Sequence, residues 1–176
     1  MKARATAIAD VLEIEVDPHA DDRGLFARTF DDAFFAELGI VHEWPQCNTS
    51  FNLHRGTLRG MHYQVEPYAE AKLVRCTRGA AFDVAIDLRA GSPTRLKWAA
   101  VELSAERRSA IYIPPGFAHG FLTLEPETEL FYHMGARYQA QSSDGVRWDD
   151  PAFGIEWPFQ PEHMAERDAT YRDFTA

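Results

Sequence analysis

The sequence predicts an all-β protein, a sandwich or barrel built from many short strands. Large apolar side chains recur at every second position in several short runs, which is typical of strands. The ten prolines and eleven glycines are spread along the chain, so they separate short elements and do not mark one hinge. A helical pattern is weak except at Asp31–Leu38 and in the last fifteen residues. We therefore expect short peripheral helices around a β-sheet core.

The clearest strand covers residues 81–88, where Phe, Val, Ile and Leu alternate with Ala and Asp. Residues 98–103 and 111–113 predict two more strands by the same criterion. Residues 121–124 and 129–133 flank an acidic, proline-containing turn, and this pattern predicts a β-hairpin.

A further predicted strand, residues 58–63, raises a geometrical question. Strict alternation puts Arg59 and His62 on opposite faces of the strand. If both serve one site, either Gly60 permits a bulge or Arg59 reaches around an edge. The sequence leaves both possibilities open.

Length and charge narrow the class of protein. The chain has 176 residues without a repeat or long linker, so one domain over residues 1–176 is expected. It is 45% hydrophobic and 12% aromatic, which is enough for a packed core. With 18 basic and 27 acidic residues the net charge is −9, which argues against nucleic acid as a partner. An anionic ligand would need a local cluster of Arg and Lys.

The cysteines and the N-terminus indicate the compartment. Cys47 and Cys76 form neither a zinc-type pair nor a disulfide framework, and we expect two thiols in a reducing environment. Acidic residues interrupt the apolar positions of the first 22 residues, so neither a signal peptide nor a membrane span is predicted. The expected location is the cytoplasm.

Four segments place reactive side chains within apolar strand context. Each has an ordinary explanation when taken singly, because a strand histidine is usually half-buried, a strand tyrosine usually packs, and a lysine is usually a solvated surface charge. The segments are Arg59–Gln64, Lys72–Arg75, Pro114–Phe121 and Phe131–His133.

Together these segments resemble the dTDP-4-dehydrorhamnose 3,5-epimerase family. The resemblance runs from about residue 10 to residue 170, in the family's order, through the blocks DDRGLF, RGMHYQ, AKLVR, FDVAIDLRAGSPT, YIPPGFAHGF and VRWDDPAFGIEWP. It implies a cupin-type jelly roll and a homodimer formed with strand exchange. It also implies a nucleoside-diphosphate 4-keto sugar as the substrate.

Epimerisation beside a ketone needs no redox cofactor, because the carbonyl acidifies the neighbouring C–H. It needs a base, an acid on the opposite face of the sugar, and a donor for the enolate oxygen. An imidazole such as His62 suits the base because it titrates near neutrality. By resemblance, Asp168 orients this base, Asp83 is a second carboxylate near the site, Tyr132 is the acid, and Lys72 stabilises the enolate.

The resemblance also assigns residues to the nucleotide or sugar, and three positions there depart from the family. The matching positions are Arg23, Gln46, Asn48, Arg59 and His119. The departures are Arg28 where Glu is usual, Ser143 where an acidic residue is usual, and Arg167 where Lys is usual. Because arginine only donates hydrogen bonds, Arg28 cannot replace a Glu that binds the N3–H group of thymine. A CDP-linked sugar is therefore an alternative to a dTDP-linked one, unless Arg28 turns outward or pairs with the diphosphate.

Other readings remain open beside the 3,5-epimerase. They are inversion at C3 or C5 alone, 3,4-ketoisomerisation, and sugar-nucleotide binding without catalysis. A metal-dependent cupin is disfavoured, because His62-Tyr63-Gln64 offers one imidazole and only His119 could join it. No metal and no cofactor are expected. The presence of His62, Lys72, Tyr132 and Asp168 together favours the epimerase, since a binding protein needs no acid and base.

Overall fold

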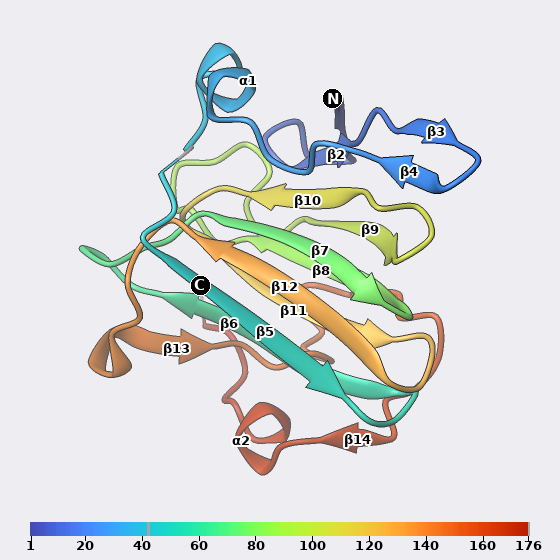
Figure 1. Cartoon of the computed structure of the whole chain (residues 1–176). Coiled ribbons are helices and arrows are strands. Elements are labelled where there is room, and N and C mark those ends of the chain that lie inside the picture. The colour runs from blue at the N-terminus through green and yellow to red at the C-terminus, as the bar shows by residue number, and fades with distance from the viewer. Residues whose placement is uncertain (42, 176) are drawn as a thin grey trace.

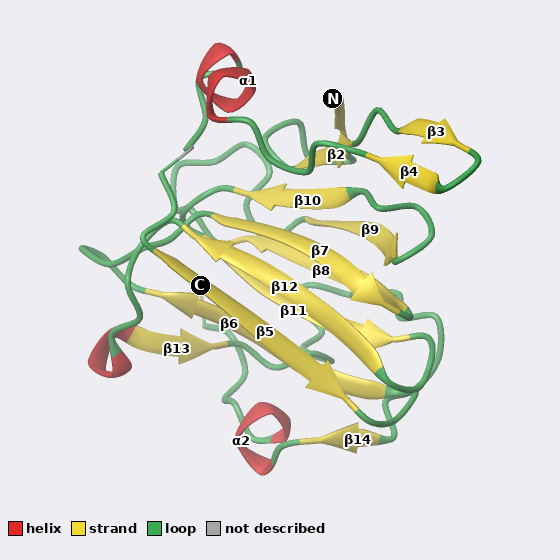
Figure 2. Cartoon of the chain, viewed as in Figure 1, coloured by secondary structure: helices red, strands yellow, loops and turns green. Residues whose placement is uncertain are grey.

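The computed structural model of the protein describes residues 1–41 and 43–175, so positions 42 and 176 of the predicted domain lie outside the described residues. Two six-stranded sheets face each other (Figures 1 and 2). The first sheet runs β1 (Lys2–Ala5), β2 (Leu12–Glu15), β10 (Ala110–Ile113), β7 (Lys72–Arg78), β12 (Thr128–Met134), β5 (Gln46–Asn52). The second runs β13 (Ser143–Gly145), β6 (Thr57–Gln64), β11 (Phe117–Thr123), β8 (Ala80–Asp87), β9 (Trp98–Ser104), with β14 (His163–Met164) beside β6. This arrangement confirms the predicted jelly-roll sandwich.

The strand predicted at 81–88 is β8, and both of its faces are buried. Its small residues Ala81 and Ala85 face the core between the sheets, where they pack with side chains such as Leu130. Its large residues Val84 and Ile86 belong to a second cluster, formed with Val146, Phe153 and Trp157 from the C-terminal part. The C-terminal chain thus covers the outer face of the second sheet, and the alternation within β8 reflects two apolar layers.

The predicted hairpin at 121–133 is wrong. β11 pairs with β6 and β8 in the second sheet, whereas β12 pairs with β5 and β7 in the first. The short connection between them therefore passes from one sheet to the other. Phe121 and Leu130 both enter the core between the sheets, which is why two adjacent strands face each other instead of pairing side by side.

The helices are short, as expected. α1 (Asp32–Glu37) lies within the predicted segment, and the Asp31 side chain caps it by accepting hydrogen bonds from Ala33 N and Phe34 N. In the described part of the last fifteen residues, the helical structure is the single turn α2 (Glu166–Ala169), which follows β14. A 3₁₀ turn, η1 (Ala140–Ser142), precedes β13. Within residues 1–41 and 43–175, no helix has the length and apolar character needed to cross a membrane.

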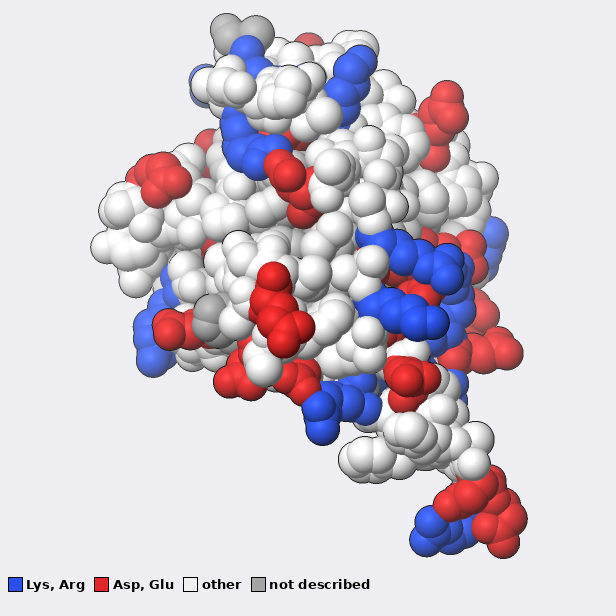
Figure 3. Space-filling view, turned by 90° about the horizontal axis from the view of Figure 1, so that it is seen from above, with Lys and Arg blue, Asp and Glu red and all other residues white. Residues whose placement is uncertain are grey.

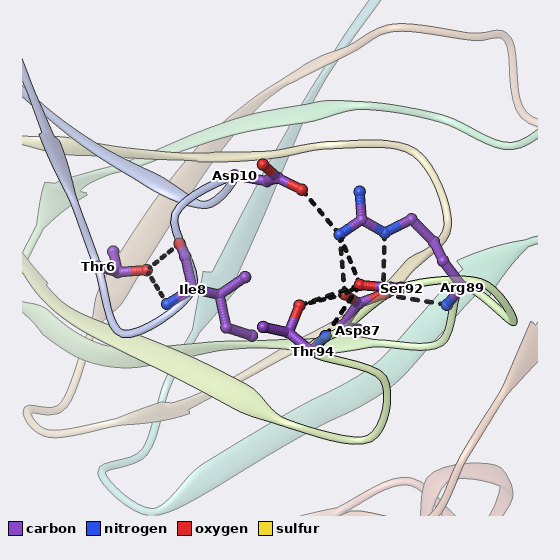
Figure 4. A network of polar contacts seen from close by, with 7 residues as sticks. All are labelled: Thr6, Ile8, Asp10, Asp87, Arg89, Ser92 and Thr94. Carbon is purple, nitrogen blue, oxygen red and sulfur yellow. Dashed lines mark hydrogen bonds and ion pairs between the residues drawn. The ribbon is translucent and has the colours of Figure 1, made fainter.

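A buried carboxylate anchors the loop that follows β8 (Figure 4). Asp87 is fully buried and accepts hydrogen bonds from Arg89 Nε at 2.9 Å, Ser92 Oγ at 2.5 Å and Thr94 Oγ1 at 2.7 Å. Arg89 also pairs with Asp10 at 2.8 Å. The network therefore ties this loop to the N-terminal segment.

A hairpin of β3 (His19–Asp21) and β4 (Gly24–Phe26) projects from the sandwich. Residues 17–26 are all exposed, and Phe26 keeps 77% of its surface in solvent. In Figure 3 the hairpin forms a narrow projection whose tip carries charges of both signs. Leu25, next to Phe26 in β4, is also exposed, so two neighbouring apolar side chains of this hairpin lie in solvent.

Candidate active site

A cavity of about 330 Å³ lies between the two sheets, with walls from β5, β7 and β12 on one side and from β6 and β11 on the other. Many residues that the sequence predicts for the site line this cavity. They are Asn48, Arg59, His62, Lys72, His119, Tyr132, Ser143 and Arg167.

A bulge in β6 brings Arg59 and His62 to the same cavity. His62 lies opposite His119 in β11, and Arg59 lies opposite Phe121, so two residues of β6 face the single residue Gly120. Gly60 has a φ of +137°, and a Cβ atom there would lie 2.5 Å from Gly120 Cα. Of the two geometries left open by the sequence, the bulge at Gly60 is the one observed.

His62 forms a dyad with Asp168 of α2. The Nε2 atom of His62 lies 2.7 Å from Asp168 Oδ1, and the Gly60 N–H donates to Asp168 Oδ2 at 3.2 Å. Burial alone would raise the pKa of the Asp168 carboxyl, but the bonds from His62 and Gly60 hold it below its ordinary value. An ionised Asp168 accepts the Nε2 proton of His62. Nδ1 is then the nitrogen that can take a proton.

Tyr132 lines the cavity from the sheet opposite to that of His62. Its ring meets the His119 ring edge-on at a centroid distance of 5.8 Å, and His119 Nε2 lies 2.8 Å from Asp83 Oδ1. Burial, and the charge of Asp83, raise the pKa of Tyr132 well above its ordinary value, against the influence of Arg59. Burial also raises the pKa of Asp83. The Tyr132 hydroxyl therefore remains protonated near neutral pH and can serve as a proton donor.

The amine of Lys72 is buried in the wall of the cavity. It lies 3.3 Å from Glu70 Oε1 and donates to the His62 carbonyl oxygen at 3.1 Å. Burial lowers the pKa of Lys72, whereas the charges of Glu70 and Asp83 act to raise it. The amine is thus held between the walls that carry His62 and Tyr132.

The outer part of the cavity carries two guanidinium groups. Arg59 Nε donates to Asn52 Oδ1 at 2.7 Å, and Arg167 donates to Ser143 Oγ at 3.3 Å. These two exposed cations are the local positive charge that an anionic ligand requires in a chain of negative net charge.

The other predicted site residues stand behind or away from the cavity wall. Gln46 donates to Asn48 Oδ1 at 3.1 Å, while Asp83 and Asp168 support the two histidines. Arg23 pairs with Asp21 at the tip of the hairpin. Arg28 pairs with the helix cap Asp31 and lines a separate hollow beside the hairpin. Within one chain, these two arginines do not join the cavity, and their contact with a ligand stays a prediction.

Several residues of the site were not singled out by the sequence. Glu70 carries no motif that points to the site, because charged residues are usually solvated, yet the Glu70 and Lys72 side chains are both buried. Asn52 and Tyr138 gave no signal, because an amide at a strand end and an exposed tyrosine are common. Among the residues that the structure describes, no three His, Cys, Asp or Glu side chains gather into a possible metal site.

Comparison with known proteins connects this geometry to a family. A model of the family described as dTDP-4-dehydrorhamnose 3,5-epimerase matches residues 5–176. A relative of that name from Sinorhizobium fredii is 43% identical, with 97% of this chain and 88% of the relative covered. The relative from Shigella flexneri is also 43% identical, with 99% and 96% covered.

Solved structures agree over nearly the whole chain. The dTDP-4-dehydrorhamnose 3,5-epimerase of Elizabethkingia anophelis has a TM-score of 0.95 at 36% identity, covering 99% of this chain and 96% of that one. The enzyme of Bacillus anthracis, solved with TDP and PPi bound, has a TM-score of 0.94 at 35% identity, covering 98% and 99%. A 3'-monoepimerase of Streptomyces bikiniensis in complex with dTDP-quinovose has a TM-score of 0.85 at 35% identity, covering 94% and 84%.

Proposed function

Because this chain belongs to the dTDP-4-dehydrorhamnose 3,5-epimerase family, we propose that it inverts C3 and C5 of a dTDP-linked 4-keto-6-deoxy sugar in deoxysugar biosynthesis. The product is of the dTDP-4-dehydrorhamnose type. One observation carries the assignment to this cavity: His62, paired with Asp168, and Tyr132 line it from opposite sheets, and the Lys72 amine lines it too and donates to the His62 carbonyl oxygen.

The proposed chemistry proceeds through an enolate. His62 removes the proton from the carbon beside the C4 ketone, and the C–H electrons move into the carbonyl group. The ammonium group of Lys72 stabilises the negative oxygen that results. Tyr132 delivers a proton to the same carbon from the opposite face, which inverts the centre. His62 then loses its proton to solvent and Tyr132 regains one, and the cycle repeats at the second carbon.

The nucleotide is proposed to lie at the outer part of the cavity, with its diphosphate near Arg59 and Arg167. Thymidine nucleotides are the first candidates, because the related Bacillus anthracis enzyme was solved with TDP and PPi. A CDP-linked sugar is the alternative that Arg28 and Ser143 raise.

Inversion at C3 alone is the second candidate reaction. The Streptomyces bikiniensis relative described as a 3'-monoepimerase has a closely similar fold, so the fold admits either outcome.

Incorporation of solvent deuterium tests the proposal. In D₂O the native protein should place deuterium at C3 and C5 of the 4-keto sugar, whereas exchange at C3 alone identifies a 3-epimerase. His62→Asn should slow exchange by about 10²–10⁴-fold, the usual loss for a general base. His54→Asn, which lies in a different hollow, is the matched control. An absence of exchange with any nucleotide sugar would overturn the epimerase assignment.

We also propose that two copies form a homodimer, in which the hairpin of one chain extends over the partner's cavity. The exposed side chains of Leu25 and Phe26, and the position of Arg23 and Arg28 away from their own cavity, support this arrangement. Light scattering should then give about twice the 20.0 kDa of one chain. Phe26→Asp should yield monomers with impaired nucleotide binding, and a native monomer at micromolar concentration would contradict the proposal.

We propose a cytoplasmic location for the protein. Cys47 and Cys76 are free thiols, and thiols remain reduced in the cytosol.

A further inference from the structure

Lys72 lines the cavity, and the buried carboxylate of Glu70, which does not line it, contacts the Lys72 amine. Glu70 and Lys72 each keep only 7% of their side-chain surface exposed, and Glu70 Oε1 lies 3.3 Å from Lys72 Nζ. The second oxygen, Oε2, accepts a hydrogen bond of 2.8 Å from Gln64 Nε2. Gln64 is itself fixed, because its Oε1 accepts from the backbone N–H of Gln139 at 2.6 Å. Both oxygens of this buried carboxylate therefore have partners, as a buried charge requires.

The contacts of Lys72 leave one N–H donor of its ammonium group for a ligand. An ammonium group has three N–H donors. Glu70 and the carbonyl oxygen of His62 take two of them within the described part of the chain. Because Lys72 lines the cavity, its third N–H is available to an oxygen atom there.

We propose that Glu70 is a positioning residue, which keeps the Lys72 ammonium charged and aimed at the carbonyl oxygen of the bound sugar. The inference rests on the enolate role of Lys72 in the proposed function. Without a nearby anion, burial would favour the neutral amine, which stabilises a negative oxygen poorly. Among the described residues, the other ionisable groups that line the cavity with this amine are Arg59 and His62 of β6, His119 of β11, Tyr132 of β12, Tyr138, and Arg167 of α2, and the charge of Asp83 on β8 also acts on it.

Asp83 does not replace Glu70 in this role. Its Oδ1 is engaged by His119 at 2.8 Å, and burial raises its pKa, so it is a weaker anion. Glu70 combines a direct contact with Nζ and two fixed oxygens. Its removal should therefore change the charge state of Lys72 and not only the stability of the fold.

An NMR titration reads this charge state without substrate. The chain has three lysines, Lys2, Lys72 and Lys97, so ¹³C-labelled lysine gives few side-chain signals. The variants Lys2→Arg and Lys97→Arg assign the Lys72 signal by elimination. In Glu70→Gln the titration midpoint of Lys72 should fall by about one to three pH units, the usual effect of a neighbouring opposite charge.

Glu13→Gln is the matched control, because Glu13 also lies 3.3 Å from its cation, Arg107, but on β2. It should leave the Lys72 midpoint in place. In kinetics, Glu70→Gln should move the basic limb of the kcat profile down by the same interval, with a smaller change in KM. If Glu70→Gln does not fold, Glu70→Asp, which keeps the charge at a greater distance, should shift the midpoint less and in the same direction.

An unchanged Lys72 midpoint in a folded Glu70 variant would overturn the inference, even if the melting temperature fell. A native protein that exchanges no deuterium overturns the proposed function instead, because the NMR titration still reports on the contact between Glu70 and Lys72.

Discussion

Replacing Asp168 by Asn tests whether the dyad sustains catalysis through His62. The substitution keeps the shape of the side chain and an oxygen that can accept from His62 Nε2, but it removes the negative charge 2.7 Å away. The protonated imidazole formed during proton abstraction then loses a charged partner. We expect a slower chemical step with a nearly unchanged affinity for the nucleotide.

The contact between His62 and Asp168 determines how far kcat/KM should fall in Asp168→Asn. A hydrogen bond to a charged group contributes about 1.5–3 kcal/mol, and each 1.36 kcal/mol changes a rate about tenfold. The expected fall in kcat/KM is therefore roughly 10- to 150-fold. Since 40% of the His62 side chain is exposed to solvent, which screens the charge, we expect the lower half of this range.

The assay is steady-state deuterium exchange, with three comparisons. Asp150→Asn is the matched control, because Asp150 is equally buried and accepts bonds of 2.8 Å and 2.6 Å from Ala152 N and Phe174 N, outside the cavity. It should lower the melting temperature while leaving the rate intact. His62→Ala with Asp168→Asn should be no slower than His62→Ala alone, because Asp168 acts through His62. Native activity in Asp168→Asn, or additive losses in the double variant, would refute the dyad.

Four further predictions concern the catalytic acid, the absence of a metal requirement, the preferred nucleotide base and the stability of the fold. Tyr132→Phe keeps the ring and should block or misdirect reprotonation without unfolding the chain; a native product ratio at a native rate would remove Tyr132 as the acid. Treatment with EDTA should leave the rate unchanged, and a loss restored by added metal would contradict the expected metal-free reaction. Calorimetry should show dTDP binding at least tenfold tighter than CDP; a preference for CDP would support the alternative raised by Arg28. Asp87→Asn should lower the free energy of unfolding by about 1.5–3 kcal/mol, because Asp87 loses its charged bonds to Arg89.

The effect of Asp87 on stability should depend on pH in a defined direction. Burial would raise the pKa of this carboxyl, but the bonds from Arg89, Ser92 and Thr94 outweigh it and depress the pKa. A depressed native pKa adds stability that is fully present above the unfolded pKa, about 3.9, and is lost as the pH falls through the native pKa. Urea unfolding should therefore show a constant gap between native protein and Asp87→Asn above about pH 5. The gap should shrink in acid, and a gap that grew there would contradict this account.

The sequence predicted the strands well and their pairing less well. Alternation at 81–88 identifies β8, because a period of two is a local property of an extended chain. Residues 121–133 were misread as a hairpin, because the local pattern of two strands and a turn is the same whether the strands pair or face each other. The long-range pairing distinguishes the two cases, because β11 joins one sheet and β12 the other.

The residues of the site likewise fall into those that local motifs predict and those that only tertiary contacts reveal. His62, Lys72 and Tyr132 come together at one cavity as the motifs predict. The role of Glu70 cannot be predicted locally, because its burial and its hydrogen bond from Gln64 of β6 are tertiary contacts. Arg23 lies in the turn of the projecting hairpin and Arg28 follows the hairpin, and neither lines the cavity of its own chain.

The contact between Gly60 and Gly120 limits how the protein can vary. A Cβ atom on Gly120 would lie 2.5 Å from Met61 Sδ and 3.0 Å from Gly60 Cα, just as one on Gly60 would strike Gly120. The contact between the two positions cannot be relieved by a smaller neighbour, because each added Cβ atom would meet the backbone of the other glycine. A saturation library covering both positions should therefore return almost only the parental pair among active clones, and attempts to redesign substrate preference have to leave these two positions untouched.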